Sequence, residues 1–369
     1  MAEPLSKPGT KHPILIAETD RPLPKHWPSG ALKYEDFEGL AEGGTAELRT
    51  CLDRNLHRRV VYKTLHEHLQ DSELEIKRFL REARVTAMIP HPGTVPVYEL
   101  GRDRYGTLFF TMKKLEGRDL RSILMDLSAR DRLVEAQFPL PRMVDLLIDA
   151  GQTLAYAHQK GVIHRDLKPA NILVGEFGEV TVLDWGLAKV RGEKASIEID
   201  QPTGAAAISM ELTQPGRRYG TPLYMSPEQA RGDEVDERTD IYNLGSVLFE
   251  ILTAKNLVYG NDVDEVLEQV LDRPTPIPHE ASPDRKIPPE LEAICLKALA
   301  KSPADRYADM PAMIDDLIRY RSGRECSVYP WGLMRRISRF RERHALALTA
   351  LVSGAIGALV CGLAVWLAR

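Results

Sequence analysis

His164-Arg165-Asp166-Leu167-Lys168-Pro169-Ala170-Asn171 is the most informative stretch of this 369-residue chain. A β-rich run, Val180-Thr181-Val182-Leu183, comes soon after it and leads into Asp184-Trp185-Gly186. Together they bring two carboxylates, an amide and a lysine into one short segment. Phosphoryl transfer needs such a set, because one carboxylate must accept the proton of the attacking hydroxyl. The amide, the second carboxylate and the cation then hold the metal and the phosphate charge.

This stretch resembles the catalytic loop and the magnesium loop of the protein kinases, with Trp185 where that family usually has Phe. One octet can arise by chance, but further matches follow in the family order over residues ~34–320. They are Lys63 in Val60-Val61-Tyr62-Lys63, Glu82 in a charged amphipathic run, Ser226-Pro227-Glu228, residues 240–245, and Arg306. Residues 225–230 and 298–301 are most similar to the bacterial, eukaryotic-like (Hanks-type) serine/threonine kinases.

The resemblance implies an α+β, two-lobed fold, with a β-rich small lobe, a helical large lobe and a nucleotide between them. It also implies transfer of the γ-phosphoryl group of ATP to Ser or Thr hydroxyls of protein substrates, with ATP and Mg²⁺ required. Asp166 would orient and deprotonate the hydroxyl, and Lys168 would stabilise charge on the γ-phosphoryl group. Asn171 and Asp184 would bind Mg²⁺.

Lys63, held by an ion pair with Glu82, would position the phosphates. The resemblance places adenine between Val61 and Leu173. The residues expected to contact the nucleotide are Leu40, Ala41, Gly43, Ala46, Leu48, Val61, Lys63, Met112, Leu173 and Asp184. Glu228 and Arg306 are expected to form a buried structural ion pair and not to react.

The glycine-rich loop departs from the family pattern Gly-x-Gly-x-x-Gly-x-Val. Residues 41–48 read Ala-Glu-Gly-Gly-Thr-Ala-Glu-Leu, so only Gly43 matches. Ala41 and Ala46 add methyl groups where the backbone should approach the phosphates freely. Val61 stands where Ala is usual and would narrow the adenine slot. These changes predict weakened ATP binding and motivate a competing hypothesis, a membrane-tethered pseudokinase acting as a binding scaffold. The intact catalytic set favours the enzyme.

Residues ~187–220 are long, polar and uneven, as in the family's activation segment. Arg165, directly before Asp166, would pair with a phosphate on this segment and order it. Thr213 lies eight residues before Thr221 and best matches the autophosphorylated region, with an ordinary loop hydroxyl as the equal alternative. Thr221 resembles the threonine that contacts the catalytic loop and distinguishes Ser/Thr from Tyr kinases.

Length and composition allow one two-lobed enzyme with additional segments. The net charge of −4 gives no general case for nucleic acid binding, and the four scattered cysteines lack zinc or redox spacing. We expect a disordered proline-rich leader over 1–30, a small lobe over 31–115 and a large lobe over 116–322. A basic juxtamembrane segment (323–344) and a transmembrane helix (345–368) complete the expected organisation.

Local patterns refine the two lobes. Strands are expected from about Tyr34 to Thr64, followed by the helix that carries Glu82. The segment from Asp126 to Pro141 is expected to be an irregular connection. A helix over 142–160 is predicted by an apolar stripe at helical spacing.

Residues 345–368 contain no charged side chain and are long enough to cross a bilayer, which needs ~20 apolar residues. Five arginines precede the run, at positions 335, 336, 339, 341 and 343, and only Arg369 follows it. Because positive charge stays on the cytoplasmic side, we expect a single-pass protein of the bacterial inner (cell) membrane with the kinase domain in the cytoplasm. Gly354 and Gly357 would allow two such helices to pack as a homodimer.

Overall fold

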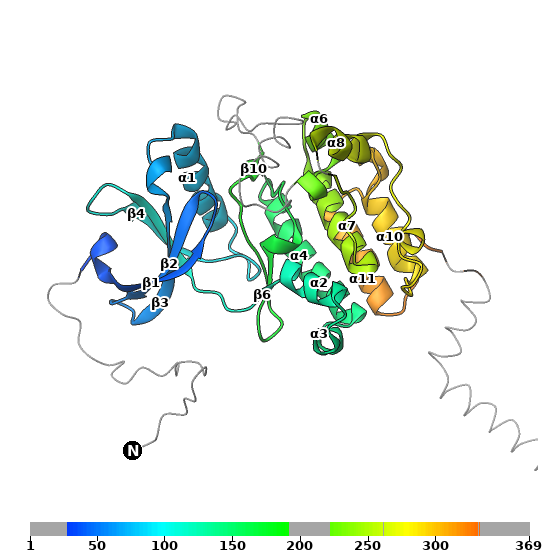
Figure 1. The fold of residues 1–369 in the computed structure, drawn as a ribbon, viewed down its shortest axis with the longest axis horizontal. Helices are drawn as coiled ribbons and strands as arrows, with labels where there is room; N and C mark the ends of the chain where they lie inside the picture. Colours follow the sequence, from blue (N-terminus) through cyan, green and yellow to red (C-terminus); the bar gives the residue numbers. More distant parts are fainter. Residues whose placement is uncertain (1–27, 192–221, 261, 331, 333–369) are drawn as a thin grey trace, which may run out of the picture.

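The computed structural model of the protein describes residues 28–191, 222–260, 262–330 and 332. They form two lobes (Figure 1), a β-rich one from the first part of the chain and a helical one from the rest. This confirms the expected protein-kinase-like α+β architecture. Among the described residues no helix has the length and apolar character needed to cross a bilayer. The run 345–368 lies outside this part of the chain.

The small lobe is an antiparallel sheet with the strand order β1-β2-β3-β5-β4. Its central strands β3 and β5 carry runs of buried apolar residues, and these form two separate clusters, as expected for a sheet that is packed on both faces. A short 3₁₀ turn η1 (Gly30–Lys33) precedes it, and η2 (Glu67–Leu69) follows β3. The strands are β1 (Tyr34–Glu42), β2 (Ala46–Asp53), β3 (Arg58–Leu65), β4 (Val97–Arg102) and β5 (Leu108–Lys113).

One long helix, α1 (Glu73–Met88), covers one face of the sheet. It begins at Ser72, whose hydroxyl accepts a hydrogen bond from the Glu75 N–H and so satisfies one of the free amides of the first turn. The buried Phe79 and Ala83 of α1 pack against Leu65 and Phe110 of the sheet. This packing turns one side of the helix toward β3, the strand that carries Lys63.

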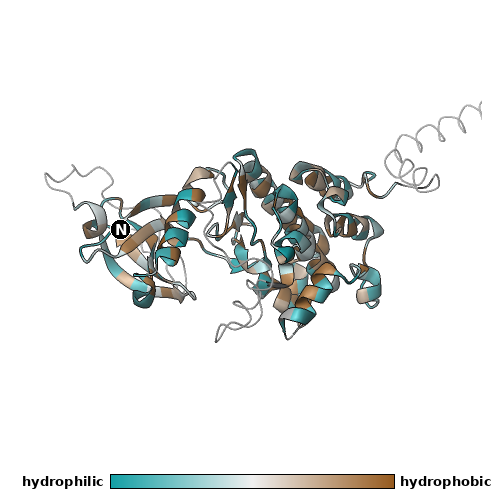
Figure 2. Cartoon of the chain, turned by 90° about the horizontal axis from the view of Figure 1, so that it is seen from above, coloured by the Kyte–Doolittle hydropathy of each residue, from teal (hydrophilic) through white to brown (hydrophobic). Residues whose placement is uncertain are grey.

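The large lobe is built around α4 (Leu140–Gln159) and α7 (Glu237–Thr253), which pack against each other. The residues of α7 from Thr239 to Phe249 are all buried, as expected for a central helix surrounded by others. Figure 2 shows that the helices of this lobe carry both hydrophobic and hydrophilic residues, as is usual for helices with one buried side. The other helices are α2 (Leu120–Ser128), α3 (Arg132–Gln137), α6 (Pro227–Arg231), α8 (Val263–Leu271), α9 (Pro278–Ala281), α10 (Pro289–Ala298) and α11 (Met310–Arg321).

Short strands lie where the two lobes meet. β6 (Arg118–Asp119), β8 (Ile172–Val174) and β9 (Val180–Val182) form one small sheet, and β7 (Val162–Ile163) pairs with β10 (Lys189–Val190). The 3₁₀ turns η3 (Pro169–Asn171), η5 (Pro222–Tyr224) and η6 (Pro303–Asp305) complete the elements. Residues 164–171 therefore connect β7 to β8, and Asp184 follows β9.

The irregular connection expected between Asp126 and Pro141 is partly wrong. α2 continues to Ser128, and α3 forms where no helix was expected. The carboxylate of Asp131 caps α3 by accepting from the Leu133 and Val134 N–H groups at 2.8 and 3.2 Å. α4 begins at Leu140, two residues earlier than expected, because proline is tolerated in the first turn of a helix.

Candidate active site

Lys63 and Glu82 form an ion pair between the sheet and its covering helix. The Lys63 Nζ lies 2.6 Å from Glu82 Oε1 and 2.7 Å from Oε2, so the ammonium binds both carboxylate oxygens. The two side chains are 16% and 17% exposed, so the pair is mostly buried but still in contact with solvent. The structure thus brings together two residues that are 19 apart in sequence.

The Asp184 carboxylate belongs to the same electrostatic group. The Asp184–Gly186 turn packs beside Glu82, because a Cβ added to Gly186 would lie 3.2 Å from Asp184 Oδ1 and 3.8 Å from the Glu82 Cβ. Burial lowers the pKa of Lys63, but the carboxylates of Glu82 and Asp184 outweigh it, so the net pKa is raised. Desolvation raises the pKa of Asp184, but Lys63 and Lys168 outweigh it, so the net pKa is lowered. Lys63 is therefore a cation and Asp184 an anion at neutral pH.

Asp166 is buried and held on two sides. The Lys168 Nζ donates to Asp166 Oδ2 at 2.7 Å. The Asn171 side-chain nitrogen donates to the Asp166 carbonyl at 2.8 Å and to Oδ2 at 3.3 Å. Because the amide nitrogen of Asn171 is used in this way, its side-chain oxygen is the atom able to bind a cation. The three residues therefore combine a proton acceptor, a cation and a metal-ligand oxygen.

Asp240, at the start of α7, holds the segment that carries Asp166. Its Oδ2 accepts from the His164 N–H at 2.9 Å and its Oδ1 from the Arg165 N–H at 2.9 Å. Its Oδ2 also lies 2.7 Å from His158 Nε2. Arg165 has a positive φ of 70°, a strained conformation for a residue with a side chain, and the surrounding bonds fix it.

His164 connects this segment to the one that carries Asp184. Its Nε2 lies 3.0 Å from the Leu183 carbonyl, and its Nδ1 accepts from the Asp166 N–H at 3.2 Å. A carbonyl only accepts, so Nε2 carries the proton. The buried Trp185 ring packs on the His164 ring with centroids 4.6 Å apart. The positions of Asp166 and Asp184, the latter with a φ of 61°, are thereby coupled.

The sheet register places several expected nucleotide residues on one face. Leu48 lies opposite Lys63, and Val61 lies opposite Met112, so all four face the same way as Lys63. Val61 and Ala46 are buried, and Leu48 and Met112 are half-buried. The others lie at the rim of the sheet or in the large lobe: Leu40, Ala41 and Gly43 are exposed, and Leu173 of β8 is half-buried. Ala46 therefore packs within the sheet as the partner of Leu65.

The side-chain oxygens of Asn171 and Asp184 suit Mg²⁺ better than a metal ion whose ligands all come from the protein. Among the described residues, no group of three or more His, Cys, Asp or Glu side chains is arranged to hold a metal. Mg²⁺ is usually bound through one or two protein oxygens, with waters and substrate phosphates completing its shell. The Asn171 oxygen and the Asp184 carboxylate match this requirement.

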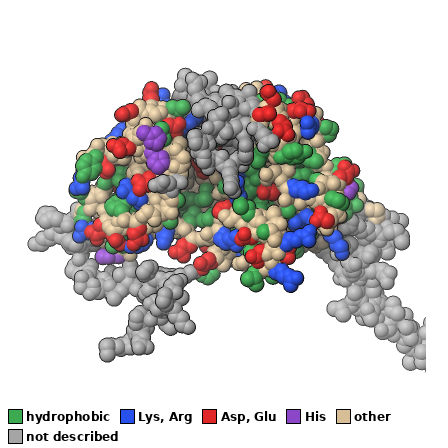
Figure 3. All heavy atoms as spheres, in the orientation of Figure 1, with side chains coloured by type: hydrophobic (Ala, Val, Ile, Leu, Met, Phe, Trp, Pro, Cys, Tyr) green, Lys and Arg blue, Asp and Glu red, His purple; other side chains and the backbone are tan. Residues whose placement is uncertain are grey.

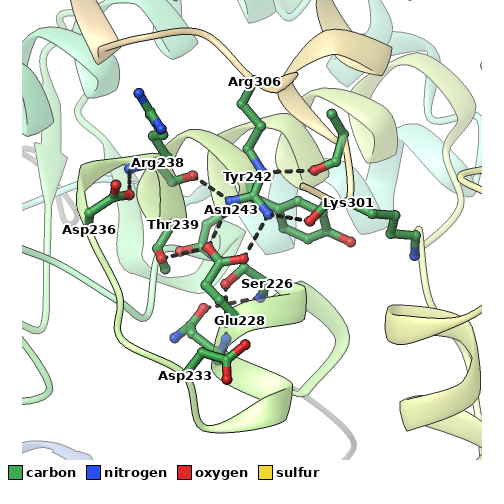
Figure 4. Close-up of polar contacts among 12 residues, drawn as sticks. Ser226, Glu228, Asp233, Asp236, Arg238, Thr239, Tyr242, Asn243, Lys301 and Arg306 are labelled. Atoms are coloured by element: carbon green, nitrogen blue, oxygen red, sulfur yellow. Dashed lines mark hydrogen bonds and ion pairs between the residues drawn. The ribbon is translucent and has the colours of Figure 1, made fainter. Parts of the chain in front are cut away.

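Glu228 and Arg306 lie together in the large lobe (Figure 4). Two parallel bonds of 2.7 Å join the guanidinium to both carboxylate oxygens. The other three N–H groups of Arg306 donate to the carbonyls of Ala300, Arg238 and Lys301 at 2.8, 2.9 and 3.2 Å. Burial raises the pKa of Glu228, but the bonds and charge of Arg306 outweigh it, so the net pKa is lowered. Every donor of a buried arginine is thus satisfied.

Gln229 connects the start of α6 to the segment that carries Asp166. Its side chain completes a capping box with Ser226 at the start of α6, and its amide nitrogen donates to the Arg165 carbonyl at 2.7 Å. The sequence reasoning assigned no role to Gln229 or Asp240. The available signal for Asp240 was its place as the first residue of the family match 240–245. Gln229 offered none, because its bond is to a backbone atom. Thr213 and Thr221 lie outside the described residues.

Comparison with known proteins agrees with the protein-kinase-like architecture described above. A model of the protein kinase domain matches residues 34–318. The chain is similar to the serine/threonine-protein kinase PknD of Chlamydia felis, with 37% identity over 296 residues that cover 79% of this chain and 31% of that protein. It is 38% identical over 310 residues to the PknD of Chlamydia trachomatis serovar L2b, covering 79% and 32%. The chain thus spans about a third of the length of these relatives.

Proposed function

Because the chain belongs to the protein kinase family, we propose that it transfers the γ-phosphoryl group of ATP to serine or threonine hydroxyls of proteins. The observation that supports this best is the closed Lys63–Glu82 pair, with both oxygens within 2.7 Å of the ammonium and the Asp184 carboxylate beside it. Together with Asp166, Lys168 and Asn171, this pair completes the set of groups that phosphoryl transfer requires.

Each side chain has a separate task in this mechanism. Asp166 orients the substrate hydroxyl and accepts its proton, and the adjacent Lys168 ammonium stabilises charge on the transferred group. Lys63 contacts the phosphates from the small lobe. The Asn171 oxygen and the Asp184 carboxylate would hold Mg²⁺, which would neutralise charge on the phosphates when bound.

The direct test is autophosphorylation of the full chain with radiolabelled Mg·ATP, comparing wild type with Asp166→Asn. The variant should lose on the order of 10²–10⁴ in rate, the range for a lost general base, while its Mg·ATP affinity changes little. Asp315→Asn, in an exposed pair with Arg319 at 2.6 Å, is the matched control. Equal rates in Asp166→Asn and wild type would remove Asp166 as the base.

A pseudokinase scaffold is the second candidate, supported by Ala41 and Ala46 in the loop and by Val61 in the sheet. It predicts that wild-type chain gives no phosphotransfer at any Mg·ATP concentration and yet keeps a stable fold. The same assay therefore separates the two candidates. Calorimetric titration with Mg·ATP then separates absent binding from absent chemistry.

We further propose control through phosphorylation of Thr213, with Arg165 as a partner of the phosphate and Thr221 contacting the catalytic segment. A phosphothreonine carries about −1.5 to −2 charges and several strong acceptors, which suits an arginine next to Asp166. Mass spectrometry after incubation with Mg·ATP should find phosphate on Thr213. Phosphate confined to Ser196, Thr203 or Ser209 would place the switch elsewhere.

Residues 345–368 support a third proposal, a single membrane-spanning helix of the bacterial cell membrane with the kinase domain in the cytoplasm. The uncharged run and the five arginines before it are the supporting features. Deleting 345–369 should move the protein to the soluble fraction without loss of activity on a peptide. It should also abolish any dimer that depends on Gly354 and Gly357. Full-length protein found wholly in the soluble fraction would contradict the proposal.

A further inference from the structure

His66 binds the turn between β1 and β2 by two hydrogen bonds. Its backbone N–H donates to the Thr45 carbonyl at 3.1 Å, which extends the β2–β3 ladder by one residue. Its ring Nε2 lies 2.8 Å from the Gly43 carbonyl oxygen. A carbonyl only accepts, so the ring is the donor. The turn of the divergent glycine loop is therefore held by a residue three positions after Lys63, on the same strand end.

The bond to Gly43 also sets the direction of the next amide. The described residues contain no cis peptide bond, and in a trans peptide the C=O and the following N–H point opposite ways. The Gly43 carbonyl points at His66, so the Gly44 N–H points away from it. His66 continues the extended backbone of β3, with φ −56° and ψ 146°. Side-chain alternation therefore puts His66 on the face opposite Lys63. The Gly44 N–H is thus directed toward the side of Lys63.

We propose that His66 is a positioning residue for the nucleotide phosphates, acting through the Gly43–Gly44 peptide; this rests on the proposed kinase function. Two adjacent glycines leave a peptide free to rotate, and an N–H without a fixed direction must lose that freedom when the nucleotide binds. The His66 bond removes the freedom beforehand. This gives the loop one preset phosphate donor although Ala41 and Ala46 replace the usual glycines.

His68 supplies a matched control. Its ring stacks on the His66 ring with centroids 5.7 Å apart and planes 14° apart, and Figure 3 shows histidine side chains in purple on the surface of the small lobe. His68→Ala removes the stacking partner and leaves the bond to Gly43. His66→Phe keeps an aromatic ring for stacking and removes the donor. His66→Gln replaces the ring by a side chain that can still donate from an amide.

The experiment measures calorimetric Kd values for Mg·ATP and for adenosine, with KM and kcat, in the full chain and in these three variants. His66→Phe should weaken Mg·ATP binding and raise KM roughly two- to tenfold, the range for one net hydrogen bond. Adenosine affinity and kcat at saturating ATP should stay within about twofold, because adenosine has no phosphates. His66→Gln should recover part of the loss, and His68→Ala should bind like wild type.

The possible results distinguish the proposed role of His66 from the proposed kinase function. Unchanged Mg·ATP affinity in His66→Phe, with wild-type binding intact, would overturn the inference alone. An equal loss for adenosine and ATP would show that His66 only supports the sheet, and would also overturn it. Wild-type chain that binds no Mg·ATP would overturn both. Equal losses in His66→Phe and His66→Gln would rule out donation to Gly43 as the cause.

Discussion

At the scale of single residues, Arg306 has five N–H groups and five protein acceptors, so its removal should cost more than that of any exposed arginine. Its side chain is fully buried and that of Glu228 is 4% exposed, so neither charge can turn to water if its partner is lost. Removing one partner of such a pair leaves an uncompensated charge, at a cost of about 3–5 kcal/mol. An exposed pair, by contrast, typically contributes less than about 1 kcal/mol.

Arg306→Met should therefore lower the free energy of unfolding by about 3–5 kcal/mol. Arg306→Lys keeps the charge but offers three donors in place of five, so its loss should be smaller. Urea unfolding of both variants measures the order. The control is Arg319→Ala, in an exposed pair with Asp315. A loss no greater than in this control would show that the buried pair is not needed for stability.

Replacing Val61 tests whether a narrowed adenine pocket weakens ATP binding. It is buried on the same face as Lys63 and lies opposite Met112. If its two extra methyl groups crowd the nucleotide, Val61→Ala should lower KM for ATP severalfold or more, since overpacking costs about 1–3 kcal/mol. Cys51→Ala, buried in the cluster that contains Tyr62 and Phe109, controls for general loosening of the sheet. A rise in KM would mean that the pocket is built around valine.

Most candidate residues could be predicted at this scale because motif chemistry involves side chains. Lys63, Glu82, Asp166, Asn171 and Asp184 were named from the sequence, and the structure gathers them. Asp240 and Gln229 were not assigned, because they act on backbone N–H and C=O groups that every residue has. A sequence records which side chains are present, but not which backbone atoms they reach.

At the scale of elements, α7 and α10 approach each other through Gly245. A Cβ at this position would lie 2.8 Å from the Ala298 Cβ and 3.3 Å from two Leu299 carbons. The Ala298 Cβ is fixed to the backbone of α10, so one helix would have to move. The close approach of the two helices therefore depends on the absence of a side chain at residue 245.

Gly245→Ala should destabilise the protein, although alanine is normally favoured in helices. Overpacking costs about 1–3 kcal/mol, which exceeds the propensity gain of up to about 1 kcal/mol. Thermal and urea unfolding measure the net sign. Ala298→Gly in the Gly245→Ala background should restore part of the loss by returning the space. Gly39→Ala, with nothing within 4 Å of an added Cβ, is the neutral control. A more stable Gly245→Ala protein would contradict the packing argument.

Element boundaries show where sequence patterns stop being informative. Strands were expected from about Tyr34 to Thr64 with a helix after them, and β1, β2, β3 and α1 confirm this, whereas β4 and β5 were not placed individually. α3 was missed, since six residues give too short a periodic pattern and its stability comes from the Asp131 cap and from burial of Val134. The start of α4 was placed after Pro141, although proline in the first turn removes no helical hydrogen bond.

At the scale of the whole molecule, buried carboxylates with lowered pKa make folding sensitive to acid. Burial raises the pKa of Asp240, but His158 and His164 outweigh it, so the net pKa is lowered below its ordinary value. The net pKa of Glu228 is lowered as well, by the bonds and charge of Arg306. When a carboxyl group has a lower pKa in the folded state, the unfolded state takes up protons first as pH falls. Its contribution to stability is present above the unfolded pKa and is lost below it.

The contribution of these two carboxylates to the free energy of unfolding should therefore be nearly constant from pH 7 to 5 and be lost progressively below about pH 4.5. Asp240→Asn should be less stable at neutral pH, and its curve should approach that of wild type as pH falls, because the variant lacks one of the titrating groups. Urea unfolding across pH 3–7 measures both curves. A constant difference between them over this range would show that Asp240 does not titrate with a lowered pKa.

Trp185 gives the molecule a built-in optical reporter. It is the only tryptophan among the described residues, and its ring lies buried on His164, directly beside Asp184. A shielded indole fluoresces at shorter wavelength than one in water, so any rearrangement of the Asp184–Gly186 turn that exposes the ring should shift its emission to the red. Replacing the other three tryptophans by phenylalanine would isolate this signal. The position of a catalytic carboxylate could then be followed in solution, in real time, without an attached dye.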